Sequence, residues 1–210
     1  DFMNSNGRGR FNKDQLVGMK RGYIADWKIS EETFVGVHSD QQWWQHYYSN
    51  GVTISGIFDI EFKLPPVPSG TYEIRLGYTV NPERGVVQAY LNNKPCGIPV
   101  DLRMYGTDPT IGWVEDTEDE EANIANDTAM HNRGYMKGMD CYRQWDSDHT
   151  LRANTNNLRR ILVTQYLDSE ETYRLRFRQV LDDPECYLSF DFIELCPKSV
   201  YGSPEGEDIY

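Results

Sequence analysis

The feature that most constrains this chain is an alternation of apolar and polar residues with a period of two. Residues 52–64 carry valine, isoleucine, phenylalanine and leucine at even positions and polar residues at odd positions, with Ile57 as the apolar exception. Because successive side chains of a strand point to opposite faces of its sheet, this pattern predicts a strand with one buried face. Pro65 and Pro66 end the strand, since proline cannot donate to a ladder.

The same alternation returns several times along the chain. It covers residues 71–80, 86–91, 172–180 and 187–195, and a β-branched and aromatic run at 160–166 predicts a further strand. Burial on one face is typical of antiparallel sheets, and the sequence contains no long amphipathic helix of the kind that parallel crossovers need. The sequence therefore predicts an all-β fold, an antiparallel two-sheet β-sandwich of jelly-roll type with a long loop insertion and little helix.

The length of 210 residues suits one large domain. We expect a single sandwich over residues 1–198, with an N-terminal segment at 1–50, a loop insertion at 103–158 and a flexible tail at 199–210. A capping-box pattern predicts a short helix over 39–48. Trp43, Trp44, Tyr47 and Tyr48 form a second aromatic candidate site there, and packing of this helix onto the sandwich is the favoured interpretation. The first residue is Asp rather than Met, which indicates a processed piece of a longer protein.

Charge narrows the possible partners. The chain has 21 Lys and Arg against 33 Asp and Glu, a formal charge of −12. This acid excess argues against nucleic acid, because phosphate neutralisation needs clustered basic residues. No run of about 18 apolar residues occurs, so we expect no membrane-spanning segment.

Metal and disulfide chemistry has weak support in the sequence. The four cysteines, Cys96, Cys141, Cys186 and Cys196, show no zinc-site spacing. We expect four free, half-buried thiols, with a Cys96–Cys141 bridge or another pairing as the alternative. The acidic run 115–121 could offer oxygen ligands to Ca²⁺ but lacks EF-hand spacing, and a solvated loop is the favoured interpretation. We therefore expect no cofactor, with Ca²⁺ as the alternative.

Enzyme signatures are absent from the sequence: it has no GxSxG, HExxH, P-loop or GxGxxG motif. The interpretation is a protein that is not an enzyme. A pair of carboxylates could still hydrolyse or cleave a glycosidic bond, so a glycoside hydrolase or lyase is kept as an alternative.

Aromatic and polar residues gather in the insertion, in a mixture suited to sugars. A flat ring can face the axial C–H groups of a pyranose while neighbouring polar side chains bind its hydroxyls, and loops on a rigid sandwich are where binding residues usually lie. The predicted ligand-binding residues are Tyr105, Trp113, Tyr142, Arg143, Trp145, Asp146 and Asp148. The alternative is that both tryptophans cover the core.

Three arginines on one predicted strand, Arg174, Arg176 and Arg178, lie on its polar face. They could contact an anionic glycan. The favoured interpretation is cross-strand pairing with acids such as Asp59, Glu61 or Glu73.

Four segments resemble a known family. The segments "LPPVPSGTYEIRLGYTV" and "GVVQAYLNNKPCGIPVDL" resemble the central strands of galactose-binding-like jelly rolls, and "RRILVTQYLDSEETYRLRFRQV" and "CYLSFDFIELCP" resemble the closing strands. The chain also resembles the region that follows fasciclin-type domains in surface lipoproteins of gut Bacteroidetes. No calcium or sugar motif of the family can be matched here residue by residue.

These resemblances imply a function class. They imply a non-catalytic carbohydrate-binding module of a secreted or surface-anchored bacterial protein, held at the outer membrane through a segment N-terminal to this chain. The partner would be a glycan or a cell-surface protein. A structural or adhesive module that contacts other proteins, associated with fasciclin domains, is the alternative.

Overall fold

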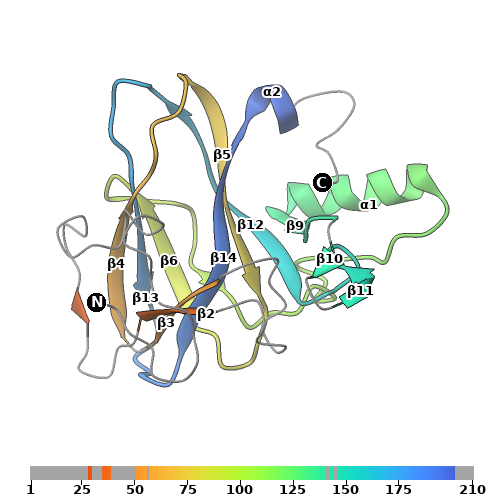
Figure 1. The fold of residues 1–210 in the computed structure, drawn as a ribbon, viewed down its shortest axis with the longest axis horizontal. Helices are drawn as coiled ribbons and strands as arrows, with labels where there is room; N and C mark the ends of the chain where they lie inside the picture. Colours follow the sequence, from red (N-terminus) through yellow and green to blue (C-terminus); the bar gives the residue numbers. More distant parts are fainter. Residues whose placement is uncertain are drawn as a thin grey trace.

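The computed structural model describes residues 28–29, 35–38, 51–55, 57–140, 142–143 and 146–201. Two sheets face each other in it (Figure 1), and every ladder between named strands is antiparallel. The predicted all-β, two-sheet sandwich is therefore confirmed. The predicted helix at 39–48 lies outside the described residues.

The first sheet has the order β1-β4-β13-β6-β7, with β8 also paired to β6. Its strands are β1 (Lys28–Ile29), β4 (Phe58–Lys63), β13 (Arg174–Gln179), β6 (Val86–Leu91), β7 (Lys94–Pro95) and β8 (Val100–Asp101).

The second sheet has the order β2-β3-β14-β5-β12-β9. Its strands are β2 (Val35–His38), β3 (Gly51–Ser55), β14 (Tyr187–Pro197), β5 (Gly70–Thr79), β12 (Asn157–Leu167) and β9 (Tyr135–Lys137). The long strands alternate between the sheets along the chain, with β4, β6 and β13 in the first and β5, β12 and β14 in the second, as expected for a jelly roll.

The core fills the space between the sheets with the residues that the alternation marks as apolar. Phe62, Phe177 and Phe190 meet there with ring centroids 5.8–6.0 Å apart. Such tilted and edge-on contacts between aromatic rings add to the free energy gained from burying their area. Ile74, Leu76 and other inward residues of β5 complete the layer.

The predicted strand at 52–64 is in fact two strands. β3 pairs in the second sheet and β4 in the first, and the break falls next to Ile57, the residue that breaks the alternation. An alternating pattern shows that one side of the extended chain is apolar. It does not show where the chain crosses from one sheet to the other, and for this reason the pattern predicted one strand where the structure has two.

The insertion between β8 and β12 contains regular structure. It holds helix α1 (Glu120–Asn132), β9 and a hairpin of β10 (Tyr142–Arg143) and β11 (Asp146–Thr150). Helix α2 (Lys198–Tyr201) follows β14 at the start of the predicted tail, and residues 202–210 lie outside the described part. Neither described helix is long and apolar enough to cross a bilayer.

Helix α1 has clear local causes but little apolar character. Asp119 caps it by accepting a hydrogen bond from the Ala122 N–H (3.1 Å), and acidic residues occupy the first turn, where the helix dipole favours them. Met130 is its buried residue. The acidic run that was predicted to be a solvated loop thus ends in the cap and first turn of a helix.

Helix α1 lies on the outer side of the second sheet, away from the first (Figure 1). His131 of α1 contacts Glu73 on the outward face of β5, and α2 packs on β5 as well. Glu73 and Arg75 are buried as a result. The sequence predicted a solvated outer face here; that prediction is wrong, because the insertion and the C-terminal helix cover the polar residues of this sheet.

Candidate functional site

Several loops meet at the end of the sandwich where β5 ends and β12 and β6 begin. The Val80 N–H donates to the Asn156 carbonyl (2.8 Å), and the Leu102 N–H donates to the Gly85 carbonyl (3.1 Å). The Gly106 N–H donates to the Thr155 carbonyl (3.1 Å). These bonds bring the 80–85 loop, the 101–114 loop and the 151–157 segment together, and we refer to this region as the loop end.

The 101–114 loop is firmly anchored. Leu102 and Ile111 are fully buried in the core, and the Trp113 N–H donates to the Gly106 carbonyl (2.8 Å), which closes the loop on itself. A Cβ at Gly106 would lie 2.6 Å from the Thr155 carbonyl oxygen, so the close approach of these backbones requires glycine. The loop therefore presents its remaining side chains from a fixed frame.

Tyr105 is the aromatic residue that this frame exposes. Its side chain is 44% exposed, although its neighbour Gly106 is buried. Four residues earlier, Asp101 accepts two hydrogen bonds from Arg103, from Nε to Oδ1 (2.8 Å) and from Nη2 to Oδ2 (2.6 Å). The hydrogen bonds from Arg103 outweigh partial burial and lower the pKa of Asp101, so the pair is charged at neutral pH. An exposed ring thus shares a rigid loop with a fixed acceptor and donor.

Trp113, the second predicted residue in this loop, packs differently. It is half-buried against the core, and the Lys137 ammonium lies 5.5 Å from the centroid of its ring. That distance is within the range of a cation–π contact. Its placement matches the alternative in which the tryptophan covers the core, while its ring joins the loop to the insertion.

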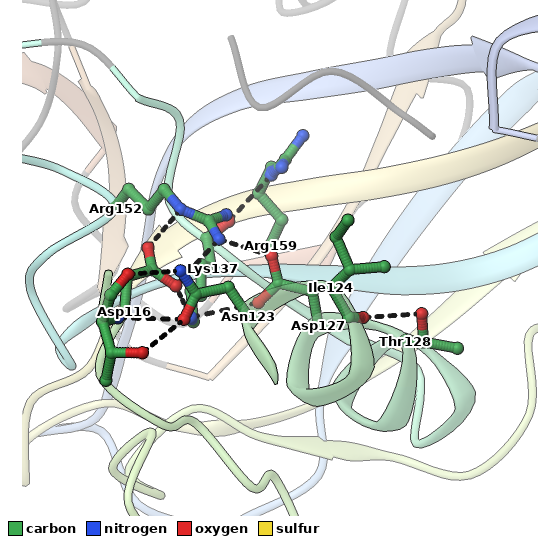
Figure 2. A network of polar contacts seen from close by, with 9 residues as sticks. Asp116, Asn123, Ile124, Asp127, Thr128, Lys137, Arg152 and Arg159 are labelled. Atoms are coloured by element: carbon green, nitrogen blue, oxygen red, sulfur yellow. Dashed lines mark hydrogen bonds and ion pairs between the residues drawn. The ribbon is translucent and has the colours of Figure 1, made fainter. Parts of the chain in front are cut away.

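Lys137 also belongs to a cluster of four charges, which Figure 2 shows at close range. Its Nζ lies 2.5 Å from Asp116 Oδ1 and 3.0 Å from Asp127 Oδ1. Arg152 lies between the same carboxylates, with Nε 2.5 Å from Asp116 Oδ2 and Nη2 2.5 Å from Asp127 Oδ2. The four residues come from the segment before α1, from α1, from β9 and from the segment after β11. The cluster therefore ties four parts of the insertion together without net charge.

The electrostatics of the cluster keep its acids ionised. Partial burial alone would raise the pKa of Asp116, but the contacts with Arg152 and Lys137 hold the pKa below its ordinary value. Burial alone would lower the pKa of Arg152, but its contacts with Asp116 and Asp127 raise the pKa above its ordinary value. Two carboxylates that share two cations form a structural ion-pair network, which differs from a catalytic pair in which one acid holds a proton.

A second charged network lies beneath α1 and α2. Arg75 donates from Nε to Glu73 Oε2 (2.9 Å), and the His131 Nε2 lies 3.1 Å from Glu73 Oε1. Glu194 lies 3.5 Å from Arg75 and 3.6 Å from Arg159. Burial alone would raise the pKa of Glu73, but its contacts with His131 and Arg75 leave the pKa below its ordinary value. This network fixes α1 on the sheet.

The remaining predicted site residues belong to the hairpin. Tyr142 and Arg143 lie in β10, and Asp146 and Asp148 lie in β11, in a ladder that pairs Arg143 with Asp146. Trp145 lies outside the described residues. Arg152, two residues beyond β11, connects the base of this hairpin to Asp116, which follows Trp113 by three residues. The structure thus places the hairpin and the 101–114 loop in the same part of the insertion.

Other sequence predictions can be placed as well. The cross-strand pairs are confirmed for two arginines: Arg174 Nη1 lies 2.9 Å from Glu61 Oε1, and Arg176 binds Asp59 through two nitrogens. Cys96 and Cys186 are buried free thiols, and burial raises the pKa of Cys96 to about 11. Cys141 lies outside the described residues. Within the described part of the chain, no cluster of three His, Cys, Asp or Glu side chains could hold a metal ion.

Sequence reasoning missed the Asp101–Arg103 pair and the four-charge cluster. An Asp-x-Arg spacing carries a signal for the first, because an Asp in a turn bonds the backbone two residues on, as Asp101 does to the Arg103 N–H (3.0 Å). The cluster joins positions up to 36 residues apart, between Asp116 and Arg152, and no local spacing could reveal it.

Comparisons with known proteins identify no family for the chain. No family model matches it, and no curated protein matches it. Among solved structures, the chain is similar to a Paenibacillus xanthan lyase, at 12% sequence identity and a TM-score of 0.43. That match covers 83% of this chain but only 13% of the lyase chain. A likeness this weak says nothing about activity. The class of the protein therefore follows from its strands alone: it is an all-β domain of two antiparallel sheets.

Proposed function

We propose that this domain is a non-catalytic carbohydrate-binding module, and that it binds glycan at the loop end through the 101–114 loop. The observation that carries the proposal is Tyr105, an exposed ring that follows the fixed Asp101–Arg103 pair by two residues on the same anchored loop. Large exposed aromatic residues with polar neighbours are typical of recognition surfaces. The proposal includes secretion or surface anchoring in a bacterium as its setting.

The chemistry of sugars suits this arrangement. A pyranose has an apolar face of C–H groups and a rim of hydroxyls, so it needs a flat ring together with donors and acceptors. Tyr105 supplies the ring, Asp101 the acceptor and Arg103 the donor. Because the loop is anchored by Leu102 and Ile111, little conformational entropy is lost when a ligand orders these side chains. The hairpin residues Tyr142, Arg143, Asp146 and Asp148, together with Trp145 and Trp113, are proposed to extend the site.

The absence of catalysis is part of the proposal. A glycosidase needs one carboxylic acid with a raised pKa to protonate the leaving oxygen. The pKa is lowered for four carboxyl groups of the described part, Glu73, Asp101, Asp108 and Asp116. These groups are therefore suited to accepting hydrogen bonds rather than to donating a proton.

The adhesive alternative has weaker support. It calls for a contiguous apolar surface patch. The three most exposed large apolar residues of the described part lie apart in the fold: Ile98 between β7 and β8, Ile124 on α1, and Tyr166 near the end of β12. The less exposed Tyr105, Val114 and Val180 belong to the 101–114 loop and the adjoining 180–186 segment. Apolar residues scattered singly on a surface are ordinary.

A glycan array followed by calorimetry on the binding glycan tests the proposal. Tyr105→Ala should weaken binding about tenfold, the effect of losing about 1.4 kcal/mol of ring contact, whereas Tyr105→Phe should retain most of the affinity. Tyr166→Ala is the matched control, since Tyr166 is 56% exposed and lies at the opposite end of β12. Binding that survives Tyr105→Ala but is lost in Trp145→Ala would move the site to the hairpin. An array with no binding would favour the adhesive module.

A further inference from the structure

The charges around Tyr105 determine which kind of glycan the loop end can accept. Arg103 is the only cation in the 101–114 loop, and both of its side-chain hydrogen bonds go to Asp101. Two other arginines belong to this end. Arg84 in the 80–85 loop is buried, and its Nη2 donates to Thr79 Oγ1 (2.7 Å). Arg152 in the 151–157 segment is paired with Asp116 and Asp127. None of the three arginines therefore presents an uncompensated positive charge to an incoming ligand.

The neighbouring loops add negative charge. The 180–186 segment joins this end because the Val180 N–H donates to the Val86 carbonyl (2.8 Å) and Tyr187 Oη donates to Glu83 Oε2 (3.2 Å). Within 80–85, 101–114 and 180–186, the carboxylates without a cationic partner are Glu83, Asp108, Asp182, Asp183 and Glu185. The domain as a whole has a formal charge of −12, so its field acts in the same direction.

Resting on the proposed function, we infer that the loop end selects neutral glycans over glycans that carry carboxylate or sulfate groups, and that the Asp101–Arg103 pair reads the sugar hydroxyls. An anionic sugar would approach an end with five carboxylates that lack a cationic partner, and the charge of the exposed Arg103 is already neutralised by Asp101, so like charges oppose binding. A neutral sugar offers vicinal hydroxyls that can donate to one carboxylate and accept from one guanidinium. Arg103 is 41% exposed and holds Asp101 through Nε and Nη2, which leaves Nη1 to donate.

Asp101 is the residue whose replacement tests this selectivity. Replacing it with Asn removes one negative charge and releases Arg103 from its bidentate partner. The Asn side-chain oxygen can still accept the hydrogen bond from the Arg103 N–H that shapes the turn. The variant should therefore fold normally and gain affinity for anionic glycans.

The test compares one polymer in two charge states, polygalacturonan and the same polymer with its carboxyl groups reduced to primary alcohols, by affinity electrophoresis and calorimetry. The wild type should bind the reduced polymer about tenfold more tightly at low salt, and added salt should narrow this gap, because salt screens exposed charges. Asp101→Asn should shift the preference toward the acidic polymer by about tenfold. Glu170→Gln is the matched control: it changes the net charge equally, from an exposed position in the turn after β12 at the opposite end.

Each outcome decides something. Equal or tighter binding of the acidic polymer by the wild type overturns the inference but leaves the proposed function standing. Equal shifts in Asp101→Asn and Glu170→Gln would show that overall charge governs selection, which overturns the role of the pair. Wild-type binding to neither polymer, and to no neutral or acidic glycan of the array, would overturn the proposed function and this inference with it.

Discussion

Replacing Lys137 with Met should loosen the insertion that supports the loop end. Lys137 is 2% exposed and lies between Asp116 and Asp127, each 33% exposed. Methionine has a similar length and no charge, so the variant keeps much of the packing against Trp113 and removes the cation. The two carboxylates would then share Arg152 alone.

The expected loss of stability follows from how deeply Lys137 and its two carboxylate partners are buried. Removing one member of a fully buried ion pair costs about 3–5 kcal/mol, whereas exposed pairs contribute about 0.2–1 kcal/mol. Water reaches both carboxylates here, so the cost lies between these limits. We expect the free energy of unfolding to fall by about 2 kcal/mol, which corresponds to a Tm lower by roughly 4–8 °C for a domain of this size.

Urea unfolding of four proteins measures the interaction directly: the wild type, Lys137→Met, Asp116→Asn and the double variant. The cycle should return a coupling energy of about 1 kcal/mol, because the two side chains are in contact. Lys63→Met is the control, since Lys63 is exposed on β4, and its free energy of unfolding should change by less than about 0.5 kcal/mol. A coupling energy near zero, or equal losses at the two lysines, would refute the reasoning.

Three further results are expected. Gly106→Ala should lower the free energy of unfolding by about 1–3 kcal/mol, because its Cβ would meet a backbone carbonyl oxygen at 2.6 Å, while Gly70→Ala, where the nearest atom is 3.5 Å away, should show little change in a thermal melt. Thr79→Val should cost about 1.5–3 kcal/mol in urea unfolding, because it removes the hydroxyl that accepts from the buried Arg84 and leaves that guanidinium nitrogen without its partner. Folding lowers the pKa of Glu73 from its ordinary value of 4.5. The contribution of Glu73 to the free energy of unfolding is therefore complete at a pH above 4.5, and it is lost as the pH falls through the pKa of the folded state. The stability difference between wild type and Glu73→Gln should accordingly shrink between pH 6 and pH 3, and a constant difference would contradict this assignment.

The sandwich could be predicted because its strands carry their own pattern. The predicted segment 86–91 coincides with β6, and the segments 71–80, 172–180 and 187–195 differ from β5, β13 and β14 by a few residues. In each of them, burial between two sheets demands an apolar residue at every second position. The arginines of β13 were also placed correctly, because charges on the solvent side of a strand find partners on the neighbouring strand.

The insertion could not be predicted in this way, because it is held by polar contacts. Helix α1 has one buried residue, Met130, so no apolar stripe with a helical period exists to be read. Asp127 of the helix contacts Arg152, 25 residues away, and His131 contacts Glu73 of β5, 58 residues away. The burial of Glu73 and Arg75 escaped prediction for the same reason, since polar residues on alternate positions look identical whether water or a charged helix covers them.

The distribution of the cations links this architecture to the inferred selectivity. The chain has twelve more acids than bases, and six bases of the described part are held in structural ion pairs away from Tyr105: Lys137 and Arg152 hold α1, Arg75 and Arg159 hold the outer face of the second sheet, and Arg174 and Arg176 hold the first. Arg103 is the cation closest in sequence to the exposed Tyr105, and it too is paired. The acid excess must therefore appear where side chains are exposed, the loop end included. A surface built in this way gains little from an anionic ligand and must obtain its affinity from ring contact and neutral hydrogen bonds, which are insensitive to salt. Binding to a neutral glycan that weakens steeply with added salt would show that an unpaired cation contributes, contrary to this distribution.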